Sequence, residues 1–123
     1  MSNATQDTTT LVTQYINTCN AAMQKHRDDF PFRQLMRASE RMLGDKNIGV
    51  GIYKDDPEAP FDFYTIKLRD GHFELVSHGK KDIDITWKAP ETYLEKVVRN
   101  PDEYISHPSK LDFDWLRSRV GLS

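Results

Sequence analysis

Apolar positions in the first third of the chain have the spacing of two amphipathic helices. Within residues 11–26 they recur every three or four positions, which is the period of one helix face. Pro31 interrupts this pattern, and a second helix is predicted over residues 31–43, with Gly44 ending it. The polar residues 1–10 are predicted to be a disordered tail. The buried face predicted for the first helix consists of Val12, Tyr15, Ile16, Cys19, Ala22 and Met23.

From Asn47 onward the apolar positions alternate with polar residues or glycine, which is the period of a β-strand. The dipeptide Asp70-Gly71, placed between two alternating segments, is a strong hairpin signal. Gly49 and Gly51 alternate with apolar residues, and glycine inside a strand indicates a bulge or the close approach of another backbone or a ligand. Four strands are therefore predicted, over residues 48–52, 61–69, 72–78 and 82–88.

The last third of the chain predicts further helices and one more strand. A helix is expected over residues 92–98, immediately after Pro90, because its apolar positions return to helical spacing. Leu111 and Phe113 alternate with charged neighbours, which predicts a short fifth strand ahead of a brief terminal helix. No repeat or linker divides residues 11–123, so we expect a single α+β domain.

Composition restricts the class of function. Seventeen basic and nineteen acidic side chains are interspersed and give a net charge of −2, so no basic face is formed and no nucleic-acid partner is expected. Cys19 is the only cysteine, which excludes an intrachain disulfide and is typical of a reducing compartment. Because no apolar run is long enough to cross a bilayer, no integral membrane segment is expected and a cytoplasmic location is predicted.

Side chains that carry chemistry do not form a recognisable motif. The four histidines lack metal-ligand spacing, and the carboxylates of residues 55–58 lie in a predicted loop, where solvated charge is the ordinary role. No serine lies in a nucleophile-elbow sequence. We therefore expect a protein that is not an enzyme and that needs no cofactor or metal.

Four segments carry a resemblance to a known family. They are Ile48-Gly49-Val50-Gly51-Ile52, the hairpin YTIKLRDGHFELVSHG at residues 64–79, Asp82-Ile83-Asp84-Ile85-Thr86 followed by the predicted helix, and Ser109-Lys110-Leu111-Asp112-Phe113-Asp114. In their order along residues 32–122 they resemble the sterol carrier protein 2-like (SCP2-like) lipid-binding family. The resemblance implies a mostly antiparallel five-stranded sheet covered on one face by helices. It also implies a tunnel between sheet and helices for a fatty-acyl or sterol-like ligand.

A tunnel of that kind would be lined by the apolar rows of the strands and of the covering helix. Trp87 is central, because an aromatic side chain presents about 150–250 Å² of surface either to a ligand or to the protein core. The two alternatives, ligand contact and plain core packing, both remain open for every residue in this set. The predicted ligand-binding residues are Tyr64, Ile66, Leu68, Ile85, Trp87, Leu94, Val97 and Phe113.

Three functions follow from these patterns. The first is non-enzymatic binding or carriage of a small apolar ligand between sheet and helices. The second is a structural or interaction module with a filled core that forms a homodimer or binds a protein partner. The third is a small enzyme that uses a buried carboxylate or histidine as a general base on an apolar substrate. The volume of any internal cavity would discriminate among them.

Overall fold

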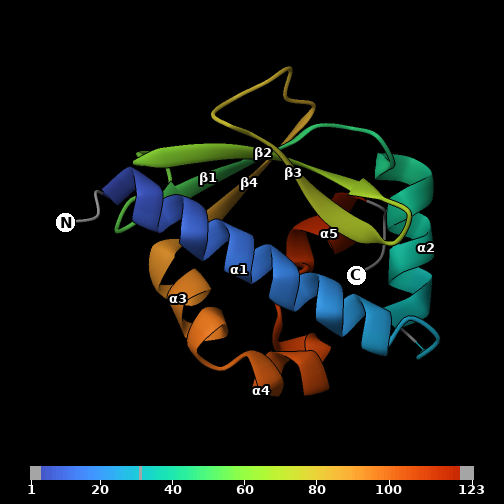
Figure 1. Ribbon diagram of the computed structural model, residues 1–123. Coiled ribbons are helices and arrows are strands. Elements are labelled where there is room, and N and C mark those ends of the chain that lie inside the picture. The colour runs from blue at the N-terminus through green and yellow to red at the C-terminus, as the bar shows by residue number, and fades with distance from the viewer. Residues whose placement is uncertain (1–3, 31, 120–123) are drawn as a thin grey trace.

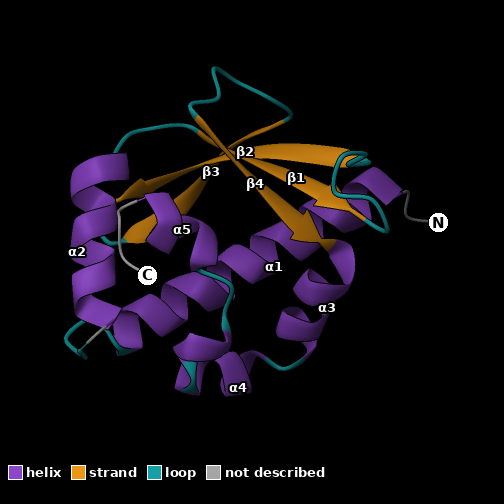
Figure 2. Cartoon of the chain, turned by 180° about the vertical axis from the view of Figure 1, so that it is seen from behind, coloured by secondary structure: helices purple, strands orange, loops and turns teal. Residues whose placement is uncertain are grey.

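A β-sheet lies over a layer of helices in the computed structural model, which describes residues 4–30 and 32–119 (Figure 1). The strands are β1 (Ile48–Tyr53), β2 (Asp62–Arg69), β3 (His72–His78) and β4 (Ile85–Pro90). The helices are α1 (Ala4–Lys25), α2 (Phe32–Leu43), α3 (Glu91–Arg99), α4 (Pro101–Ser106) and α5 (Asp114–Arg119), with a short 3₁₀ turn at Pro108–Lys110. Seen from behind, α3, α4 and α5 lie on the same side of the sheet as α1 (Figure 2).

The sheet has four strands in the order β3-β2-β1-β4. β1 pairs with β2 and β2 pairs with β3 in antiparallel fashion, whereas β1 and β4 are parallel. The sheet is therefore mixed, and β3 and β4 form its two edges among the described residues. The prediction of an α+β fold with helices gathered on one face of the sheet is confirmed at this level.

The predicted fifth strand is wrong. Leu111 and Phe113 are buried, as expected, but the residues between the 3₁₀ turn and α5 pair with no strand. Both side chains enter the core from an irregular segment, and the ring of Phe113 packs 5.9 Å from that of Phe32 in α2. The alternation of Leu111 and Phe113 with charged residues correctly predicted that both side chains are buried. Two apolar positions are too few to distinguish a strand from a loop that crosses the core.

β4 begins three residues later than predicted because the segment before it turns sharply. Asp82 has a φ of 48°, a left-handed conformation that ends regular alternation. The side chain of Asn47 donates to the carbonyls of Lys81 and Asp82, and its backbone N–H donates to the Asp84 carboxylate at 2.8 Å. As a result Ile83 does not share the buried row of Ile85, Trp87 and Ala89, contrary to the predicted alternation.

α1 starts at Ala4, seven residues before the predicted start, and crosses the whole sheet (Figure 1). Thr8 is buried, and Thr9 hydrogen-bonds to Tyr64 of β2, so these residues belong to the fold and not to a tail. The predicted apolar row of α1 is confirmed, because every member is at most 7% exposed. α1 therefore forms the main cover of the inner face of the sheet, the face whose side chains point toward the helices.

Candidate functional site

An apolar enclosure lies between the inner face of the sheet and the helices. Its void measures only about 20 Å³, which is room for about one water molecule or methyl group. An acyl chain or a sterol does not fit this space in the conformation shown. The walls are almost entirely apolar and consist of Val12, Tyr15, Ile16, Cys19, Val50, Ile66, Phe73, Trp87, Leu94, Phe113 and Trp115.

The structure places all eight predicted ligand-binding residues in one buried core, at most 8% exposed. Four of them line the cavity: Ile66, Trp87, Leu94 and Phe113. The other four are buried outside its lining: Tyr64, Leu68, Ile85 and Val97. Leu68 lies toward α2, where its carbonyl accepts a hydrogen bond from Asp45, and Tyr64 points its hydroxyl toward the first turns of α1.

The side chain of Trp87 is packed against other aromatic side chains of the core. Its ring is stacked against Tyr15 at a centroid distance of 5.8 Å and against Trp115 at 5.4 Å. Phe73 lies 6.3 Å beyond Trp115. The aromatic surface that was predicted to face a ligand is therefore covered by rings from α1 and α5. Sequence analysis did not assign these two rings to the site, although the helical spacing of Tyr15 had marked it as buried.

Burial suppresses ionisation of the titratable groups beside the cavity. Desolvation raises the pKa of the Cys19 thiol to about 12, with a hydrogen bond from Tyr15 partly opposing this shift. Desolvation also raises the pKa of Tyr93 to about 12 and that of Tyr15 well above its ordinary value. The two tyrosine hydroxyls lie 3.0 Å apart, and that of Tyr93 accepts the backbone N–H of Asp112 at 2.6 Å. These groups are neutral at physiological pH and offer no nucleophile or base.

One polar atom of the cavity wall lacks a partner. The buried indole Nε1 of Trp115 has no hydrogen-bond acceptor among the described residues. The only other buried side-chain atom of this kind in the described chain is Oδ1 of Asn47, which lies outside the cavity. An unpaired buried donor costs about 1–3 kcal/mol, so an acceptor supplied by a bound molecule would recover that free energy. The cavity is thus an apolar space, and one of the residues that line it carries an unsatisfied donor.

Polar contacts fix α1 over the cavity at both ends and in the middle. Near its start, Thr9 lies 2.9 Å from the hydroxyl of Tyr64. In its third quarter, the amide of Asn20 accepts the backbone N–H of Phe73 at 2.7 Å and donates to the carbonyl of the same residue at 2.9 Å. Beyond its end, the ring of His26 bonds Ile105 O at 2.8 Å. Opening the cavity by moving α1 requires these contacts to break.

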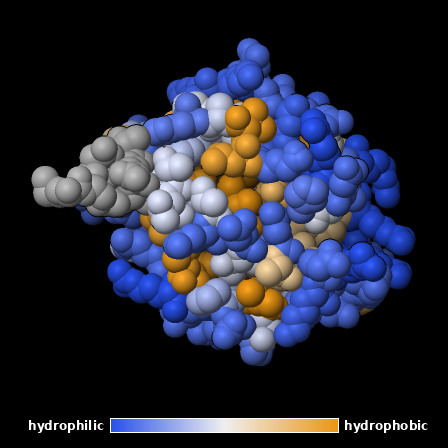
Figure 3. All heavy atoms as spheres, in the orientation of Figure 1, coloured by the Kyte–Doolittle hydropathy of each residue, from blue (hydrophilic) through white to orange (hydrophobic). Residues whose placement is uncertain are grey.

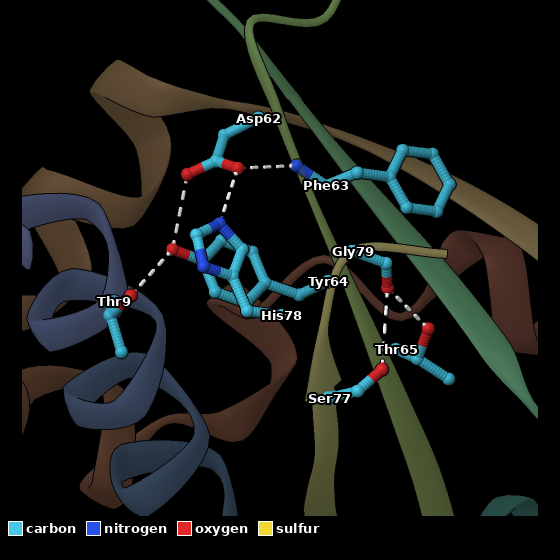
Figure 4. A network of polar contacts seen from close by, with 8 residues as sticks. All are labelled: Thr9, Asp62, Phe63, Tyr64, Thr65, Ser77, His78 and Gly79. Carbon is cyan, nitrogen blue, oxygen red and sulfur yellow. Dashed lines mark hydrogen bonds and ion pairs between the residues drawn. The ribbon is translucent and has the colours of Figure 1, made fainter. Parts of the chain in front are cut away.

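The contact at the start of α1 belongs to a larger network (Figure 4). Tyr64 donates its hydroxyl proton to Asp62 at 3.1 Å, so Thr9 must be the donor to Tyr64. The other carboxylate oxygen of Asp62 accepts from the ring of His78 at 2.7 Å, and that ring stacks on Tyr64 with centroids 4.5 Å apart. The pKa of the Tyr64 hydroxyl is raised above its ordinary value, mainly because burial disfavours its charged form. The network joins α1, β2 and β3.

A second hollow lies on the outer face of the sheet, opposite α1. We call it the outer groove. Its void measures about 230 Å³, more than ten times that of the inner cavity. Sequence analysis did not find it, because its walls come from two loops that fold over the outer positions of the strands. It is lined by Gly51, Pro57, Glu58, Pro60, Phe63, Lys80, Ile83, Thr86 and Lys88.

Residues 4–30 and 32–119 contain no group of three or more histidine, cysteine, aspartate or glutamate side chains placed to hold a metal ion. Within the same residues, no helix combines the length and apolar character that a membrane span requires. On the face seen in Figure 3, hydrophobic atoms form small groups separated by hydrophilic ones.

Comparisons were made with protein-family models, with curated proteins and with solved structures. None of the three comparisons found a match.

Proposed function

We propose that the protein binds an apolar ligand carrying one hydrogen-bond acceptor, and that α1 moves outward to admit it. The observation that carries this proposal is the apolar cavity under α1, lined in part by Trp115, whose buried indole N–H has no acceptor among the described residues. Ligand sites are typically apolar with a few convergent polar groups that set orientation. A fatty acid or a sterol combines these two properties, which agrees with the resemblance to the SCP2-like family.

Movement of α1 is a necessary part of the proposal. The closed cavity of about 20 Å³ accepts no more than about one methyl-sized group. Each methylene transferred from water into an apolar site contributes about 0.8 kcal/mol, so a ten-carbon chain supplies about 8 kcal/mol toward opening. This is enough to offset the loss of a few side-chain hydrogen bonds at about 1 kcal/mol each. Affinity should therefore rise with acyl chain length.

Two built-in reporters make the experiment direct. Trp87 and Trp115 are the only tryptophans of the chain, and both line the cavity. Titration with saturated fatty acids of increasing length should change their emission, with tighter binding for longer chains. Cys19, 1% exposed and also in the wall, should react with a thiol reagent only when α1 opens, and a bound ligand should slow that reaction.

The donor is tested separately from the cavity. Trp115→Phe keeps an aromatic ring but removes the N–H, so fatty-acid affinity should fall about fivefold or more. Unchanged emission and unchanged Cys19 reactivity with every chain length would refute ligand binding in this cavity. Binding that persists at full strength in Trp115→Phe would refute only the role of the donor.

A second candidate function rests on the edge strand β3. Leu75 and Val76 are 39% and 37% exposed there, next to backbone groups that no strand covers. Exposed edge strands pair readily with other chains, which fits a homodimer or a partner that adds a strand. Sedimentation of the wild type against Leu75→Lys would test this candidate. A monomer at every concentration in both proteins would refute self-association through β3.

A further inference from the structure

The outer groove has the features of a small-molecule site that is already open. Its floor includes the backbone of β1 at Gly51, which Phe63 and Pro60 flank closely, and its sides are the loop that carries Glu58 and the loop that carries Lys80. Apolar surface comes from Phe63, Ile83 and two prolines, and the remaining walls carry the charges of Glu58, Lys80 and Lys88 and the hydroxyl of Thr86. Apolar surface beside a few convergent polar groups is typical of ligand pockets.

The two glycines of β1 have different explanations. A Cβ at Gly49 would lie 2.7 Å from the ring of Phe63, so only glycine allows that ring to lie flat on the sheet. A Cβ at Gly51 would meet Phe63 and Pro60 at 3.4 Å, which is close to ordinary contact. Alanine is therefore sterically acceptable at Gly51 and loses less backbone freedom on folding than glycine does. The packing of the protein does not require this glycine, whereas a ligand resting on the floor of the groove would.

The charges of the groove favour an anion. Lys88 forms an ion pair with Glu58, so these two charges compensate each other. Lys80 has no carboxylate within ion-pair distance among the described residues, and its ammonium lies 4.8 Å from the centre of the Phe63 ring. The groove therefore presents one uncompensated positive charge directly beside an aromatic surface. A ligand with a negative group attached to a flat apolar body complements both features.

We propose that the outer groove binds a small monocarboxylate with a flat apolar body. The carboxylate pairs with Lys80, and the apolar body lies over Gly51 against the side chains of Phe63 and Ile83. This site lies on the opposite face of the sheet from the cavity under α1 and does not depend on movement of that helix. It is therefore independent of the function proposed above.

The test is an NMR titration of the full-length ¹⁵N-labelled chain with phenylacetate, using phenylacetamide as the uncharged analogue. Phenylacetate should shift the backbone amides of Gly51, Phe63 and Thr86. It should also bind about tenfold more tightly than phenylacetamide, because a charge-assisted hydrogen bond is stronger than a neutral one. Shifts confined to cavity residues, no shifts at millimolar phenylacetate, or equal affinity for the two compounds would overturn the proposal.

Single substitutions distinguish binding in the outer groove from a general effect of net charge on phenylacetate affinity. Lys80→Gln should weaken phenylacetate binding about tenfold, whereas Lys81→Gln, at an exposed lysine outside the groove, should leave it unchanged. Glu58→Gln frees Lys88 and removes a negative charge from the rim, so affinity should rise.

Gly51→Ala should lower affinity while the unfolding temperature stays equal or increases, because the methyl group occupies the floor without disturbing the fold. Equal effects of Lys80→Gln and Lys81→Gln, weaker binding in Glu58→Gln, or wild-type affinity in Gly51→Ala would each overturn the proposal.

Discussion

Asn20 protects the exposed edge of the sheet, and its removal should be unusually costly for a partly exposed residue of a helix. Its side-chain amide makes two hydrogen bonds with the backbone of Phe73, one to the N–H and one to the carbonyl. β3 is an edge strand, so no neighbouring strand pairs with it on this side. At Phe73 the amide of Asn20 makes the two backbone hydrogen bonds that such a strand would otherwise make. Phe73 is 4% exposed, so water does not readily take the place of the amide.

The magnitude follows from these two bonds. Asn20→Ala loses about 1 kcal/mol for each hydrogen bond and leaves a buried donor and a buried acceptor unpaired, which costs more than the bonds alone. Asn17 is exposed on the same helix, and Asn17→Ala changes helix propensity by the same amount. The free energy of unfolding of Asn20→Ala should therefore lie about 2–4 kcal/mol below that of Asn17→Ala. Asn20→Asp keeps the acceptor but not the donor and should fall between them.

Urea denaturation followed by tryptophan emission measures these differences directly. The same samples should be examined by size-exclusion chromatography, since uncovering β3 at Phe73 lengthens the free edge and should increase self-association. Equal unfolding free energies for Asn20→Ala and Asn17→Ala would refute the reasoning. That result would mean that the amide contributes no more than a solvated side chain.

Three further predictions concern packing, the polar network and pH. Gly49→Ala should destabilise the fold by about 1–3 kcal/mol, because the new methyl group clashes with Phe63; denaturation of Gly49→Ala against wild type measures this. Tyr64→Phe should cost about 1–2 kcal/mol and speed amide exchange in the first turns of α1, and unchanged exchange there would contradict it. Burial raises the pKa of Cys19 and of Tyr93 to about 12, so the unfolded chain releases these protons first. Stability should be constant up to about pH 9 and then fall by up to about 1.4 kcal/mol per pH unit for each group until about pH 12, and Cys19→Ala should remove the earliest part of the fall.

Residue periodicity predicted the local elements and the buried rows well. Burial of the α1 row and of Tyr64, Ile66 and Leu68 follows from side-chain spacing alone, because a repeat of 3.6 or 2 residues fixes which positions share a face. The hairpin at Asp70-Gly71 was predicted from its turn chemistry, and both residues have positive φ. These features depend on neighbours in the sequence, which is why they could be predicted.

Features set by distant contacts could not be predicted in the same way. The early start of α1 depends on Tyr64 and on the sheet that covers Thr8, more than fifty residues away. The irregular path through Leu111 and Phe113 buries two side chains without backbone pairing, and alternation alone does not reveal whether a partner strand exists. The void under α1 depends on how closely Trp115 packs on Trp87, which is a property of shape and not of spacing.

The two faces of β1 lead to different binding kinetics at the two proposed sites. On the inner face, Ile48, Val50 and Ile52 are at most 3% exposed, and a ligand must wait for α1 to open. On the outer face, Gly51 lies beneath a groove that already has about 230 Å³ of room. Binding rates for fatty acid should therefore reach a plateau with concentration, at the rate measured by labelling of Cys19 in the free protein. Rates for phenylacetate should rise linearly with concentration. A linear rise for fatty acid, far above the labelling rate of Cys19, would show that α1 does not control entry.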